Sequence, residues 1–199
     1  MKLFPAVIFL FLLSSFAFSQ AEKLPEILKP TLADESEAQS LGVEVFKILP
    51  RRMFETTFND YTDENNPIGI REGGAFYSFT TGSHSYNKVP EVMLEQGSFA
   101  VGFAGMNYGF IADLGDTQLA QINRDAPSIH FALTYVPPRF ESEIRNEPKR
   151  LSHYESDGLI YARRVPATEG HTYVLRAITF GRADKLVSLQ VRRKDADGV

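Results

Sequence analysis

The fold is decided by residues 92–101, which read VMLEQGSFAV. A Gln96-Gly97 pair between two apolar segments is typical of the two-residue loop of a β-hairpin. With that loop, Leu94 lies opposite Phe99, and the next pair outward is also apolar. Because turn chemistry and side-chain pattern agree, this stretch predicts an antiparallel hairpin with one face on a hydrophobic core.

The same two-residue period recurs on both sides of this hairpin and predicts further strands within 74–193. In residues 129–135, for example, Ile129, Phe131, Leu133 and Tyr135 alternate with other side chains. Residues 139–157 are charged and contain a proline, so we expect an exposed excursion with one helical turn at most. The remaining expected strands are 74–80, 109–114, 159–165, 171–180 and 185–193.

One long helix is expected, at about 35–49. Asp34 and Glu37 have the spacing of a capping box, apolar residues follow at helical spacing, and Pro50 stops the pattern. One helix followed by many short strands predicts a mainly β protein, all-β or α+β. The expected architecture is a single-domain antiparallel sandwich or partly open barrel with this N-terminal helix.

The start of the chain predicts export. The end of the chain leaves two possibilities for the pairing of the last strand. Residues 1–19 combine a positive start, an apolar run and small residues before Ser19, which is typical of a signal peptide cut after Ser19. We therefore expect a soluble secreted or periplasmic protein with no stable membrane anchor, a linker at 20–33 and one domain at 34–199. The tail at 197–199 is either frayed, which we favour, or cut short before a final strand, which would leave 185–193 as an unpaired edge.

Composition excludes several classes of function. The chain has 21 basic and 25 acidic residues, and this acidic balance argues against nucleic-acid binding. It contains no cysteine, which rules out disulfides, zinc–thiolate sites and a cysteine nucleophile. No G-x-S-x-G motif is present, and no catalytic residue and no cofactor is predicted.

The sequence therefore favours a binding or structural module over an enzyme. Tyr86, Asn107 and Tyr108 fall on expected turns, where they would form a recognition surface for an unknown protein, peptide or carbohydrate partner. Arg176 lies in an expected strand between apolar residues. Its guanidinium either is paired or meets an anion in a cleft, or it points to water, and we favour the last because it avoids burying a charge.

Two other functions stay open. In an extended chain His153, Glu155 and Asp157 project to one side and can serve a divalent ion, although a solvated loop is the simpler interpretation. That set, or a dispersed pair of a histidine and a carboxylate, would support an extracytoplasmic hydrolase, possibly metal-assisted. A third possibility is a subunit whose strand edge pairs with a partner.

Overall fold

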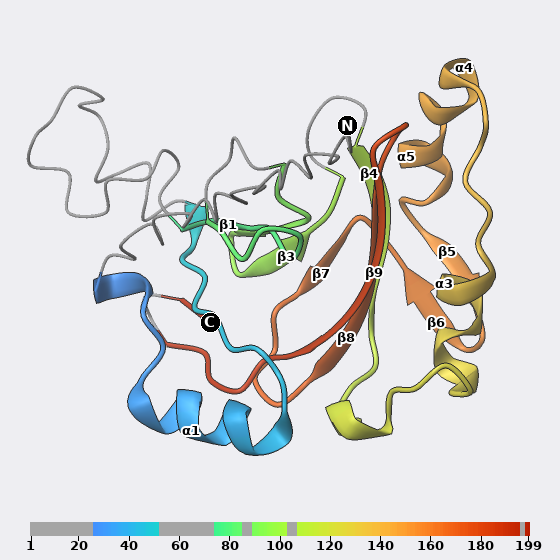
Figure 1. Cartoon of the computed structure of the whole chain (residues 1–199). Coiled ribbons are helices and arrows are strands. Elements are labelled where there is room, and N and C mark those ends of the chain that lie inside the picture. Colours follow the sequence, from blue (N-terminus) through green and yellow to red (C-terminus); the bar gives the residue numbers. More distant parts are fainter. Residues whose placement is uncertain (1–25, 52–73, 85–88, 103–106, 196–197) are drawn as a thin grey trace, which may run out of the picture.

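Two antiparallel sheets form the centre of this computed structural model (Figure 1), which describes residues 26–51, 74–84, 89–102, 107–195 and 198–199. The first sheet has the strand order β1 (Phe76–Tyr77), β2 (Val92–Glu95), β3 (Ser98–Ala100) and β7 (Arg164–Pro166). The second has the order β4 (Asn107–Asp113), β8 (Thr172–Thr179) and β9 (Ala183–Gln190). The protein is mainly β with a sandwich-like arrangement, as the sequence predicts, and the described strands do not close into a barrel.

The predicted hairpin is confirmed in its register. Leu94 lies opposite Phe99, and both are buried. Gln96 and Gly97 both have positive φ, 51° and 73°, which is the backbone of a type I′ turn. That turn matches the natural twist of the two strands and fixes which side chains face the core.

Two hydrophobic clusters lie on opposite faces of the β4-β8-β9 sheet. One fills the space between the two sheets and includes Phe99, Tyr173 and Leu175. The other packs against the far face of β4 and β8 and includes Phe110 and Val174. This second cluster is covered by α3 (His130–Thr134), α4 (Glu141–Ile144), α5 (Glu147–Arg150) and the hairpin of β5 (Tyr154–Ser156) and β6 (Leu159–Tyr161) (Figure 1).

The strand expected at 129–135 is wrong, because this segment is a 3-10 turn, η4 (Pro127–Ile129), followed by α3. Pro127 occupies the first turn of η4, where its missing N–H costs nothing. Phe131 and Tyr135 then pack around Phe110 of β4. A short apolar run does not distinguish helix from strand by period alone, and here tertiary packing decides.

The N-terminal helix is also shifted from its expected position. It is α1 (Leu32–Leu41), and its capping box is formed by Thr31 and Asp34. Gly42 ends it in the left-handed conformation, with φ of 66°. Residues 43–49 then have no regular secondary structure, and Ile48 is buried there rather than on a helix.

Three smaller expectations need correction. The excursion at 139–157 is not merely exposed, because α4 and α5 bury Ile144 and Glu147. The expected linker contains η1 (Glu26–Leu28), whose Leu28 is fully buried. The end of the tail is paired rather than frayed, since Val199 exchanges two backbone hydrogen bonds with Ile48. Within the described ranges no helix is long and apolar enough to span a membrane.

Candidate functional site

A cavity of about 380 Å³ lies between α1, the segment 43–48 and the strand β9 with the residues that follow it. This volume falls within the range of small-ligand sites, which starts near 300 Å³. Its walls are mostly apolar. The lining residues are Pro30, Asp34, Glu37, Ala38, Leu41, residues 43–48, Phe79, Phe99, Leu119, residues 187–193, Asp195 and Val199.

An aromatic group forms one wall of this cavity. Phe46 and Phe79 line it, and both contact Tyr77 behind them. The Phe46 ring stacks on Tyr77 with 3.9 Å between ring centroids, and Phe79 meets Tyr77 edge-on. Val187 and Leu189 of β9 also line the cavity. Leu189 belongs to the cluster between the two sheets, and Val187 packs against that cluster. The cavity is therefore an opening into one edge of the main hydrophobic core.

The helix α1 covers this opening with little packing of its own. Ala38 is its only buried residue, whereas Leu32 and Leu41 are 85% and 58% exposed. Two ion pairs instead link α1 to the chain after β9: Glu37 with Arg192, and Asp34 with Arg193 at 3.2 Å. The rim of the cavity thus carries charges of both signs, already paired with each other.

Asp34 also stabilises the start of the helix. A hydrogen bond from the Thr31 hydroxyl, aided by the Thr31 amide and by Arg193, holds the pKa of Asp34 below its ordinary value. A carboxylate with a lowered pKa stabilises the fold above its ordinary pKa, and this contribution is lost as the pH falls through the lowered value. The attachment of α1 therefore weakens in acid.

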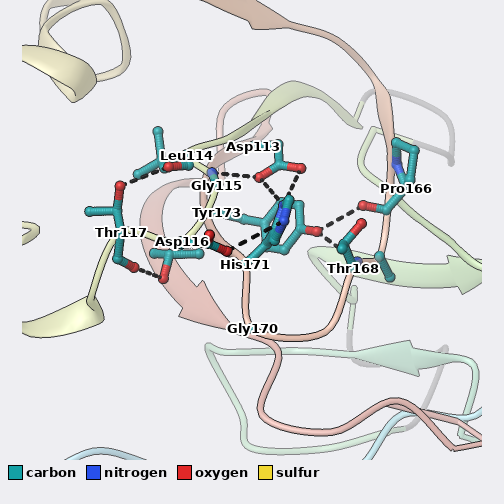
Figure 2. A network of polar contacts seen from close by, with 12 residues as sticks. Asp113, Leu114, Gly115, Asp116, Thr117, Pro166, Thr168, Gly170, His171 and Tyr173 are labelled. Atoms are coloured by element: carbon teal, nitrogen blue, oxygen red, sulfur yellow. Dashed lines mark hydrogen bonds and ion pairs between the residues drawn. The ribbon is translucent and has the colours of Figure 1, made fainter.

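A second polar group lies near the ends of β4 and β8 (Figure 2). His171 directs Nδ1 to both carboxylate oxygens of Asp113, at 3.0 and 2.9 Å, and its Nε2 lies 3.7 Å from Asp116. Asp113 is itself held by the Gly115 amide at 2.8 Å. A carboxylate on Nδ1 leaves Nε2 to act as a proton acceptor, which is the arrangement of a general base.

Arg176 is buried and paired, so the expectation that it points to water is wrong. Both faces of β8 are covered, and the Arg176 side chain is only 13% exposed. It binds Asp184 through two hydrogen bonds, at 2.8 and 2.7 Å, and donates to the Ala132 and Tyr135 carbonyl oxygens at 2.8 Å each. These contacts occupy its donors, and the hydrogen bonds to Asp184 raise its pKa further. Arg176 therefore serves the fold.

A similar network lies beside it. Glu147 is buried, receives a hydrogen bond from the Tyr135 hydroxyl and forms a two-point ion pair with Arg150. Burial by itself raises the pKa of Glu147, but the hydrogen bonds from Arg150 and Tyr135 outweigh burial and lower it. This carboxylate stays charged and joins α5 to the end of α3.

The structure does not assemble the predicted recognition surface. Tyr108 lies in β4 rather than on a turn and is 1% exposed; burial raises the pKa of its hydroxyl to about 12. Asn107 begins β4 opposite Thr179 and is half-buried. Tyr86 lies outside the described residues. A role for these three in ligand binding stays a prediction, but Tyr108 has no exposed surface to offer.

The three candidate metal ligands do not form one cluster. His153 Nε2 lies 3.3 Å from Glu155, and both side chains are exposed. Asp157 instead accepts a hydrogen bond from the Phe131 amide at 2.9 Å, at the start of α3. Among the described residues, no group of three histidine, aspartate or glutamate side chains is placed to hold a metal ion.

Neither the cavity nor the His171–Asp113 pair could be found by a local motif. Asp113 and His171 are 58 positions apart, and α1 is separated from β9 by almost the whole domain. Comparison of the chain with family models, with curated proteins and with solved structures gives no match. Function must therefore be argued from the site itself.

Proposed function

We propose that this protein is an exported, soluble binding module whose ligand occupies the cavity between α1, residues 43–48 and β9. The observation that carries the proposal is an apolar cavity of about 380 Å³ that opens into the core at one edge of the sandwich. Export is proposed from the signal-like residues 1–19 alone. The proposed partner is a molecule with an apolar surface, and it is not a nucleic acid.

Physical chemistry favours a ligand here over an empty space. Apolar surface that is shielded from water gains about 25 cal/mol for each Å², and the rim charges are already neutralised by the ion pairs of Glu37 and Asp34. A ligand is therefore held mainly by its apolar surface. The helix α1, which lines the cavity, is held in place by one buried side chain and two ion pairs.

The proposal predicts that filling the cavity abolishes binding of an apolar probe. The uncharged dye N-phenyl-1-naphthylamine should bind the mature chain, meaning residue 20 onward, and the fluorescence of the dye should increase on binding. Ala38→Phe places a ring in the cavity and should weaken dye binding at least ten-fold. Val187→Phe should do the same from the opposite wall.

The control is Leu32→Phe, which adds apolar surface to the same helix at a position that is 85% exposed and outside the cavity. It should leave the dye affinity unchanged. Melting temperatures of the three variants report whether each one is folded. Equal dye affinity in all of them, or no dye binding by the folded parent, would contradict the proposal.

A second function, ester or amide hydrolysis, is favoured by one specific observation: His171 is oriented by Asp113 as a general base. The proposed chemistry is proton abstraction from a water molecule by Nε2 while Asp113 stabilises the charged imidazole. Within the described residues no serine or threonine hydroxyl is hydrogen-bonded to Nε2, so water is the nucleophile in this proposal.

Hydrolysis of p-nitrophenyl acetate tests this second function. Because any exposed imidazole cleaves this ester slowly, the comparison is between His171→Gln and His130→Gln, the latter at an exposed position on α3. His171→Gln should lower the rate at least ten-fold and His130→Gln should not. Equal small losses in both variants would remove hydrolysis as a candidate.

A further inference from the structure

The strand β9 forms an edge of its sheet, and its hydrogen-bonding pattern shows which groups point outward. Val191 donates to the His171 carbonyl and accepts from the Gly170 amide, so its backbone faces β8. Partners in an antiparallel ladder alternate, so Leu189 also faces β8, and the N–H and C=O groups of Ser188 and Gln190 point away from it.

These outward groups are unpaired. Within the described part of the chain, β9 has β8 as its sole strand partner, and no hydrogen bond to the backbone N–H or C=O of Ser188 or Gln190 is present. A row of free backbone donors and acceptors on an edge strand is a template for a further strand.

This free edge borders the cavity. Five successive residues, 187–191, line it, which requires that the cavity touch the backbone of the strand and not one face alone. At about 3.3 Å per residue they span roughly 16 Å. The segment 43–48, which has no regular secondary structure, lines the same cavity at each position.

We propose that the ligand of this cavity is an extended peptide segment, which adds to the edge of β9 as a strand through Ser188 and Gln190. Alternate side chains of such a strand lie on the same face as Val187 and Leu189 and enter the apolar cavity. The peptide is therefore apolar at every second residue. This inference rests on the proposed function and names its ligand class.

A small apolar molecule fits the volume but leaves the backbone groups of Ser188 and Gln190 unpaired. A peptide strand satisfies both the apolar walls and these groups. The rim supports the same choice, because Arg192 and Arg193 are already paired with Glu37 and Asp34, so no net charge is needed on the ligand.

Backbone N-methylation separates the two cases. The probes are fluorescein-labelled peptides of the form Lys-X-Thr-X-Thr-X-Lys, with X valine, leucine or phenylalanine, titrated by fluorescence anisotropy against the folded mature chain. Each has two derivatives, one methylated on the amides of all X residues and one on those of both threonines. These amides point to opposite edges of an extended peptide. For the peptide that binds best, one derivative should lose affinity at least ten-fold and the other should retain it.

Substitutions in β9 test the same backbone contact from the protein's side. Ser188→Pro removes an outward N–H while the bonds to β8 stay in place, and it should weaken peptide binding at least ten-fold. Ser188→Ala removes the hydroxyl but keeps the N–H, and it should bind like the parent. Gln190→Pro repeats the test at the second outward position, and dye binding together with the melting temperature shows that each variant is folded.

The outcomes distinguish the two proposals. Dye binding without binding of any of the three peptides would overturn the peptide inference and leave the cavity as a small-molecule site. Peptide binding that is insensitive to both methylation patterns, or to both proline variants, would also overturn it. If the folded parent protein binds neither the dye nor any of the peptides, the proposed function itself is contradicted.

Discussion

Replacing Arg176 by alanine is expected to lower the free energy of unfolding by about 3 kcal/mol. The side chain makes two hydrogen bonds to Asp184 and one each to the Ala132 and Tyr135 carbonyl oxygens. Without it, the two carbonyls, which lie in α3 and at its C-terminal end, and the partly buried carboxylate all lose their partner. The Asp184 side chain is 37% exposed, so water compensates in part, and this keeps the expected loss at the lower end of the range for a broken buried pair.

Arg145 provides the matched control for this substitution. It also forms an ion pair, with Glu141 at 2.8 Å, but its side chain is 74% exposed on the surface of α4. Arg145→Ala should therefore cost no more than about 0.5 kcal/mol. Denaturant unfolding followed by circular dichroism gives both values. If the two variants lose the same free energy, the guanidinium of Arg176 does not join the helices to the sheet as described.

Replacing Gly109 by alanine is expected to be at least as damaging, with a loss of about 3 kcal/mol or more. A Cβ at this position would lie 2.1 Å from the Arg176 carbonyl oxygen of the paired strand. The obstacle is backbone in the middle of the β4–β8 ladder, so a change of rotamer does not relieve it. The strands β4 and β8 would have to separate.

Gly181 serves as the control for this second substitution. It has a positive φ of 67°, but a Cβ there would meet no heavy atom within 4 Å. Gly181→Ala should therefore cost only the strain of the left-handed conformation, about 1 kcal/mol. Thermal unfolding of both variants measures the difference. A Gly109→Ala protein as stable as Gly181→Ala would show that β4 and β8 do not approach as closely as described.

The parts of the fold that follow from the sequence are those in which local chemistry and tertiary packing agree. The Gln96-Gly97 turn and the Leu94–Phe99 pair are an example, because turn geometry alone sets the register. Local rules were insufficient for residues 129–135, where a run of alternating apolar residues forms a helix because Phe131 and Tyr135 pack around Phe110. In the N-terminal helix, Gly42 ends the helix before the apolar residues that seemed to continue it.

The candidate site could be anticipated only in part. The sequence predicts an unpaired edge at 185–193 only if the chain is cut short before a final strand, which is the alternative that we do not favour. Among the described residues β9 has β8 as its sole strand partner, although the tail itself is paired through Val199 and Ile48. The cavity has no local signal, because α1 and β9 meet only after the chain is folded. Arg176 shows a further limit: a sequence cannot tell that both faces of one strand are covered.

The most direct test of the cavity as a ligand site is a ¹H–¹⁵N correlation spectrum of the chain from residue 20 onward, titrated with N-phenyl-1-naphthylamine. The account predicts that the amide shifts cluster at 187–193, 43–48 and the α1 residues Ala38 and Leu41. Shifts confined to the exposed apolar residues Val136 and Phe140, or no saturable shifts at all, would contradict it.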